Sequence, residues 1–263
     1  MRRFLIWFGL VALAAAPALA DITLRYSVKG QPTKQIVVSA TADGRARLDS
    51  GGGVLITRDG TGYFISRDAQ GEFVGRQEDG LAIMTAFMAA IVAMIPADDQ
   101  GQMASFRAMA TAPYEVRAGV RETVGGREGV VHTIAPAAGG QGPTLEIVLA
   151  TDADLEPAGR ELRRLLAMMH GPAEAILGQS PDILRELEAL FARGVPIRIG
   201  DQFTLASASA EPIPETVFAL PGPVLSLEEL QGRMAIMVPP PSSGPPVITV
   251  TTPGEQEPDA DDE

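Results

Sequence analysis

The chain has no cysteine and only two histidines among its 263 residues. The absence of cysteine excludes disulfides, a thiol nucleophile and any cysteine-ligated metal site. The two histidines, His132 and His170, do not form an H-x-x-x-H pair, and no carboxylate cluster in the sequence offers an alternative ligand set. The sequence therefore predicts neither a bound metal nor a cofactor.

Catalytic signatures are missing as well. There is no G-x-S-x-G element, and the three glycines at 51–53 precede a strand-like run at 54–56 instead of a helix with lysine. The glycines therefore predict a turn or bulge rather than a phosphate-binding loop. One enzymatic alternative stays open, because a Ser-His-acid triad is assembled in space: a hydrolase with His132 or His170 beside a serine and a carboxylate. Our main expectation is that the protein is not an enzyme.

Positive charge is in the minority, and the formal net charge is −12. Part of the acid lies in residues 239–263, which begin with PPPSSGPP and end with DADDE. A proline-rich and acidic segment cannot build a core, so we expect this tail to be disordered. The acidic balance repels phosphate groups, which excludes nucleic acid as a partner and disfavours anionic lipid surfaces.

The first twenty residues have the pattern of a secretory signal peptide. Arg2 and Arg3 precede an apolar run at 4–15, and Ala18-Leu19-Ala20 forms an A-x-A cleavage site. The predicted cleavage after Ala20 places the mature protein in the periplasm. Asp21, not cysteine, follows the cleavage site, so we expect no lipid anchor. The remaining chain predicts one domain at 21–238 and the tail at 239–263.

The most apolar stretch of the mature chain is LAIMTAFMAAIVAMI at 81–95, in which fourteen of fifteen residues are apolar. As a helix it would be about 22 Å long, shorter than the ~30 Å hydrocarbon core of a membrane, and acidic residues flank it. A helix that is apolar on all sides predicts burial within the protein. Four alanines form a small-residue stripe that would permit close approach of a neighbour: Ala82, Ala86, Ala89 and Ala93.

Two interpretations of this helix remain open: a plain core helix, or a plug over the sheet that an apolar ligand displaces. Methionines are concentrated between residues 84 and 109, and flexible thioethers suit surfaces that accept varied shapes. A second short helix is expected at 98–109.

The remainder alternates with the period of strands. Residues 22–28 alternate apolar and polar side chains, and turn signals such as Asp43-Gly44 and Asp59-Gly60 separate further short runs up to 77. Strands resume at 114–151, helices are predicted at 154–193, and strands close the domain at 196–199 and 202–209. Adjacent strands without helices between them predict antiparallel pairing. The fold class is therefore α+β, with a curved antiparallel sheet.

The segments DITLRYSV, ADGRARLD, LITRDGTGYFI and ETVGGREGVVHTI, together with GVPIRIGDQFTLASASAEPIPETVFALP, appear in this order. This layout resembles the periplasmic outer-membrane lipoprotein carrier superfamily and related secreted bacterial proteins, over about residues 21–222. The resemblance implies a half-open β-barrel of about eleven strands, with two helical inserts packed on its concave face. It also implies that acyl chains bind on that face.

We therefore expect a carrier for an apolar ligand, such as an acyl chain, a lipid or a lipoprotein. The ligand would lie between the sheet and the helix at 81–95, in a concave apolar cavity. The predicted lining is Met84, Phe87, Met88, Ile91, Met94, Met103 and Phe106. The alternative is an envelope protein-interaction scaffold without a small-molecule site, which would contact its partner through the tail or the helices at 154–193.

Overall fold

The computed structural model describes residues 21–95, 100–138, 140 and 142–237. The predicted signal peptide at 1–20 and the predicted tail at 239–263 lie outside the described residues, so both stay predictions. Within the described segments, none of the helices combines the length and the apolar character needed to cross a membrane.

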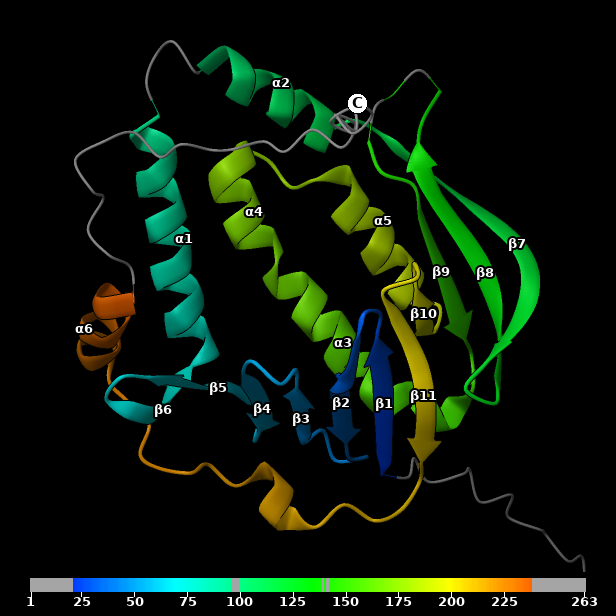
Figure 1. Cartoon of the computed structure of the whole chain (residues 1–263), viewed down its shortest axis with the longest axis horizontal. Helices are drawn as coiled ribbons and strands as arrows, with labels where there is room; N and C mark the ends of the chain where they lie inside the picture. The colour runs from blue at the N-terminus through cyan, green and yellow to red at the C-terminus, as the bar shows by residue number, and fades with distance from the viewer. Residues whose placement is uncertain (1–20, 96–99, 139, 141, 238–263) are drawn as a thin grey trace, which may run out of the picture.

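Eleven strands form one antiparallel sheet (Figure 1). Their bounds are β1 Ile22–Val28, β2 Gln31–Ala40, β3 Ala46–Asp49, β4 Val54–Arg58, β5 Thr61–Asp68, β6 Gly71–Arg76, β7 Tyr114–Val124, β8 Arg127–Pro136, β9 Leu145–Ala150, β10 Val195–Ile199 and β11 Phe203–Ser209. The spatial order is β6-β5-β4-β3-β2-β1-β11-β10-β9-β8-β7, so β6 and β7 are the two edges and the sheet is not closed. The prediction of an open antiparallel sheet in an α+β fold is confirmed.

The strands form where the sequence alternates with period two. In β1, Ile22, Leu24 and Tyr26 are buried while Arg25 and Ser27 face solvent. The β4–β5 hairpin turns at Asp59 and Gly60, whose φ angles of 51° and 73° match the two-residue turn that an Asp-Gly pair favours. Glycines 51–53 turn the chain between β3 and β4, as predicted.

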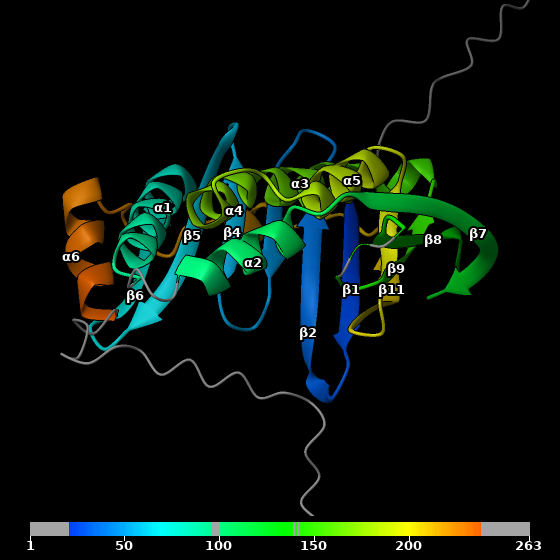
Figure 2. The same cartoon turned by 90° about the horizontal axis from the view of Figure 1, so that it is seen from above.

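The helices have the bounds α1 Gln77–Ala93, α2 Gln100–Ala110, α3 Glu156–Met168, α4 His170–Leu177, α5 Asp182–Phe191 and α6 Leu227–Met237. The short 3₁₀ helices are η2 Ala153–Leu155 and η3 Glu215–Phe218. Figures 1 and 2 show α1, α3, α4 and α5 lying side by side in a layer on one side of the sheet. The second predicted insert, at 154–193, therefore corresponds to α3, α4 and α5.

The core lies beneath α3 and α5. Leu155 and Ala158, at the start of α3, are fully buried against the inner side chains of the central strands. Leu190 and Phe191, at the end of α5, fill a second cluster with residues of β7, β8 and β9. Leu162 of α3 packs against both clusters, so this helix joins the two halves of the core.

The predicted burial of the apolar helix is wrong. Only Gln77 of α1 is buried, and all four alanines of the small-residue stripe are exposed. The physical reason is its position near the β6 edge of the sheet, where its main neighbour is the short α4 and where β5, β6 and α6 contact it more sparsely. Apolar composition predicts burial only when enough neighbouring surface is available, and here one helix covers one side.

Candidate functional site: the exposed apolar face of α1

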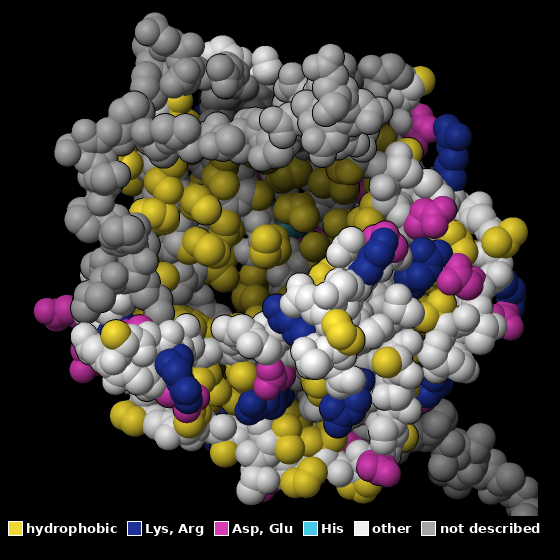
Figure 3. All heavy atoms as spheres, viewed as in Figure 1, with side chains coloured by type: hydrophobic (Ala, Val, Ile, Leu, Met, Phe, Trp, Pro, Cys, Tyr) yellow, Lys and Arg dark blue, Asp and Glu magenta, His cyan; other side chains and the backbone are white. Residues whose placement is uncertain are grey.

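Four bulky side chains form an exposed row along α1 and its C-cap residue, Met94, and we call this row the apolar stripe: Met84, Phe87, Ile91 and Met94. Their spacing of three, four and three residues places them within an arc of roughly 80° on one side of the helix. Met84, Phe87 and Ile91 are each 37% exposed, and Met94 is 59% exposed. Figure 3 shows hydrophobic side chains gathered over α1 and α4 in a hollow of this face, beside a region rich in charged side chains.

A different side of α1 packs on its neighbour α4. A Cβ built on Gly171 of α4 would lie 3.8 Å from the Thr85 hydroxyl, so the two helices approach closely at this point. Met88 is only partly exposed. Met169, just before α4, is 53% exposed.

The structure thus brings five of the predicted ligand residues together on one helix, but places four of them at the surface. Met103 and Phe106 belong to α2, and their side chains lie outside the described part of the chain. The prediction that these two residues line a site with α1 stays a prediction.

The start of α1 is fixed by close packing. The backbone at Gly75 and Gly80 leaves room for the Phe64 ring, which a Cβ at either position would approach to 2.6 or 2.7 Å. Leu230 of α6 is fully buried at the same place, 3.2 Å from the Cβ position of Gly75. Because this end is fixed, the apolar stripe is presented on an anchored helix.

A buried polar cluster lies close to the first residue of α1. Glu161 of α3 is 5% exposed and accepts a hydrogen bond from the Thr57 hydroxyl at 3.0 Å. It also accepts two from Arg164, at 3.0 Å from Nε and 2.9 Å from Nη2. A Cβ on Gly62 would overlap Gln77 and lie 2.7 Å from Arg164 Nη1, so this glycine lets the first residue of α1 approach the cluster.

The charged residues of α1 itself are acidic. Glu78 and Asp79 occupy the first turn of α1, and no basic residue lies in its last turn. The nearest basic residue in sequence, Arg76, is paired with Glu78 at 3.5 Å. A helix with this charge pattern is suited to an apolar partner with a neutral or basic rim, and poorly suited to anionic lipid headgroups.

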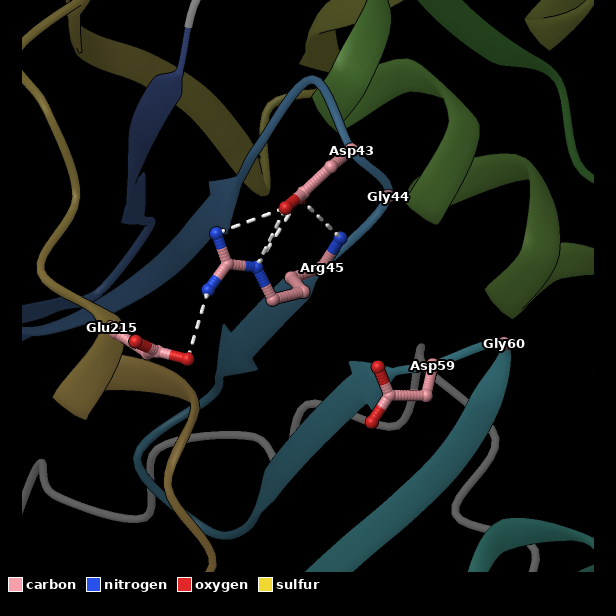
Figure 4. Close-up of a pocket in the computed structure, with 6 residues that line it drawn as sticks. All are labelled: Asp43, Gly44, Arg45, Asp59, Gly60 and Glu215. Carbon is pink, nitrogen blue, oxygen red and sulfur yellow. Dashed lines mark hydrogen bonds and ion pairs between the residues drawn. The ribbon is translucent and has the colours of Figure 1, made fainter.

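Two pockets occur elsewhere, at hairpin turns. The first has a volume of about 460 Å³ and is lined by Asp43, Gly44, Arg45, Asp59, Gly60 and Glu215 (Figure 4). Arg45 pairs with Asp43 at 3.0 Å and with Glu215 at 3.6 Å, so its charge is already matched within the pocket. Hydrogen bonds from the Thr41 hydroxyl and from Arg45 lower the pKa of Asp43 to about 2.

The second pocket, of about 280 Å³, adjoins the first and is bordered by Phe218 and Thr216. Neither pocket contains a residue of α1. The predicted cavity between the apolar helix and the sheet is therefore not one of these two pockets. Among the described residues, no group of three or more His, Asp or Glu side chains is arranged to hold a metal ion.

His170 lies beside both a serine and a carboxylate, the arrangement that the hydrolase alternative requires. Its Nδ1 contacts the Ser180 hydroxyl, and its Nε2 is 2.9 Å from Glu188 Oε1. The Glu188 contact is not aligned as a hydrogen bond. Ser180 is followed by Pro181, which has no N–H group, so the backbone donor that commonly stabilises an oxyanion next to a nucleophile is missing.

This cluster is better described as a structural contact that links α4 to α5. Although Ser180 lies just before α5, this helix begins without a side-chain cap, and the Ser180 hydroxyl contacts His170 instead. The other histidine, His132 on β8, has no hydrogen-bond partner for Nδ1 among the described residues, and burial lowers its pKa.

Comparisons with known proteins leave the family open. No protein-family model and no curated relative matches the sequence. The crystal structure of MucB in complex with MucA(peri) is 16% identical over 77% of this chain and 55% of that chain, with a TM-score of 0.31. The crystal structure of MucB is 15% identical over 77% of this chain and 58% of that chain, also with a TM-score of 0.31. The chain spans little more than half the length of these neighbours, and so low a TM-score carries no argument about family or function.

Proposed function

We propose that this protein is a non-enzymatic periplasmic interaction scaffold that binds another envelope protein through the apolar stripe of α1. The observation that carries the proposal is the exposure of Met84, Phe87, Ile91 and Met94 in one row on an anchored helix. Contiguous exposed apolar surface on a folded protein is a common mark of an interaction site. The periplasmic address rests on the predicted signal peptide.

The spacing of the apolar stripe suggests the kind of partner. Side chains at i, i+3, i+7 and i+10 form a seam that packs against a second amphipathic helix or into an apolar groove. Glu78 and Asp79 at the start of α1 favour a partner with basic residues at its rim. The open sheet with helices on one side is compatible with the half-barrel of the lipoprotein carriers, and we extend that superfamily resemblance to this chain as part of the proposal.

A carrier of an acyl chain is the second candidate. The methionines of α1 and the hollow in Figure 3 favour it, since thioethers adapt to flexible chains. An acyl chain must be shielded from water along its length, however, and the side chains predicted to shield it are partly at the surface. For this reason we place the protein partner first.

The test is site-specific photo-crosslinking of the full-length protein in cells, with a photoreactive phenylalanine analogue at Phe87. We expect a discrete protein adduct that Ile91→Asp abolishes. Val120→Asp is the matched control, because Val120 is an apolar side chain that is 75% exposed on β7, far from α1. An adduct that survives Ile91→Asp would refute the role of the apolar stripe, and an extractable lipid in native mass spectra with no protein adduct would favour the carrier.

A further inference from the structure

We infer that the chain's own segment at 247–250, Val-Ile-Thr-Val, covers the apolar stripe when no partner is bound, so that a partner must displace it. This inference rests on the proposed function, because it describes how access to the same surface is regulated. It joins three observations: the exposed row on α1, the position of α6 and the sequence that follows α6.

The first observation is that the described part of the protein leaves the apolar stripe open. Phe87 and Ile91 retain 37% of their accessible surface, and Met94 retains 59%. Apolar side chains arranged in one row gain free energy when a further apolar segment removes them from water. The surface is therefore suited to a short extended or helical segment.

The second observation is where the described chain ends. The last element, α6, contacts α1, and Figures 1 and 2 show the two helices as neighbours. It is anchored there by fully buried Leu230 and by Arg233, whose Nη2 donates to Asp68 Oδ1 at 2.7 Å. Arg233 also lies over the Phe73 ring, 4.7 Å from its centroid. The residues after Met237 therefore start beside the helix that carries the apolar stripe.

The third observation is the sequence after α6. Residues 238–246 separate α6 from the run at 247–250, and nine residues reach at most about 30 Å. The helix α1 has seventeen residues and is about 26 Å long, so the run reaches any part of the stripe. Within 239–263, the other residues are mainly proline, serine, threonine and acid, which leaves 247–250 as the apolar run suited to this surface.

The experiment uses the absence of cysteine, which makes a single introduced thiol a unique label. Ala90 is exposed on α1 beside the apolar stripe, so Ala90→Cys in the full mature chain carries a polarity-sensitive fluorophore. Ile248→Asp places a charge in the covering segment, and Thr251→Asp places the same charge just outside it. The same dye on Val120→Cys gives the emission of a label in water.

We expect blue-shifted emission from the label at position 90, independent of protein concentration. Ile248→Asp should move it to the value of the Val120→Cys reference, while Thr251→Asp should leave it unchanged. An emission that Ile248→Asp leaves unchanged, or that both variants shift equally, would overturn the inference. An emission that depends on concentration would overturn it in favour of a second copy of the chain as the occupant.

Partner capture separates this inference from the proposed function. If both are right, Ile248→Asp should increase the yield of the adduct formed at Phe87, because the competing segment is gone. If Ile91→Asp leaves that adduct intact while the label responds as expected, the covering contact stands and the proposed function fails. If Ile91→Asp abolishes the adduct while Ile248→Asp changes neither emission nor yield, the proposed function stands and the inference fails.

Discussion

The substitution Leu230→Ala tests how α6 is held on the rest of the protein. Leu230 is fully buried, and its side chain lies 3.2 Å from the Cβ position of Gly75, which the Phe64 ring also approaches, at the point where α6 meets β6 and the start of α1. Leu227, one turn earlier on the same helix, is 44% exposed. The two leucines therefore form a matched pair that differs in burial and shares a helix.

The expected magnitude follows from the burial of the side chain. Truncation to alanine deletes three buried carbon atoms. Their burial contributes about 2 kcal/mol to the free energy of unfolding, at ~0.8 kcal/mol each. Any cavity that remains raises the loss further, and core Leu→Ala changes span about 2–5 kcal/mol. Because α6 is the last element described and can move toward the gap, we expect about 2–3 kcal/mol. Leu227→Ala should cost less than about 1 kcal/mol.

The assay is urea unfolding followed by circular dichroism, with hydrogen exchange across α6. A loss of 2–3 kcal/mol should lower the urea midpoint by roughly 1 M when the slope is unchanged. If α6 detaches locally instead, exchange protection should fall in α6 and at the start of α1 while the midpoint moves less. The reasoning would be refuted if Leu230→Ala and Leu227→Ala gave the same midpoint and the same exchange pattern.

Four further predictions concern other contacts. Glu161→Ala should lower the free energy of unfolding by about 3 kcal/mol, measured by urea unfolding, because Arg164 then loses its buried partner; an unchanged midpoint would contradict this. Ser226→Ala should cost about 1 kcal/mol by breaking the cap of α6. Hydrogen bonds from the Ser226 N–H and hydroxyl lower the pKa of Glu229. The ionised carboxylate therefore stabilises the fold at pH values above its ordinary pKa, and this stabilisation is lost as the pH falls through the lowered pKa. Glu229→Ala should flatten the acid side of a curve of unfolding free energy against pH. A fluorophosphonate probe should leave Ser180 unlabelled at neutral pH by mass spectrometry, since Pro181 supplies no backbone donor; stoichiometric labelling would instead support the hydrolase.

Much of the sheet could be predicted because strands and hairpin turns leave local signals. The alternation in β1 and the Asp59-Gly60 turn are properties of short segments, and the structure has them where the sequence indicates. The helix α6 also leaves a local signal, since Ser226 and Glu229 have the S-x-x-E spacing of a capping box and exchange hydrogen bonds at 2.8 and 3.3 Å. Our sequence-based prediction missed it.

The environment of α1 could not be predicted in the same way. Burial depends on which elements lie beside a helix, and the sequence of α1 does not state that α4 is its main neighbour. The His170 cluster shows the same limit, because Ser180 has the sequence context of a helix cap while the fold places a histidine within its reach. The spacing of the apolar stripe along one side of a helix could be read from the sequence, but its exposure became visible only from the fold.

The position of β1 has a consequence for biogenesis. This strand is the first of the described chain, yet it lies in the middle of the sheet between β2 and β11, and the Tyr26 hydroxyl donates at 2.7 Å to the carbonyl of Pro196, 170 residues later. A chain that is synthesised from its N-terminus exposes one edge of β1 until β11 has been made. Contacts over so long a separation form slowly because closure of the loop costs entropy. During that interval the β1–β2 hairpin has an unpaired edge, so efficient folding of this protein should depend on a holding chaperone.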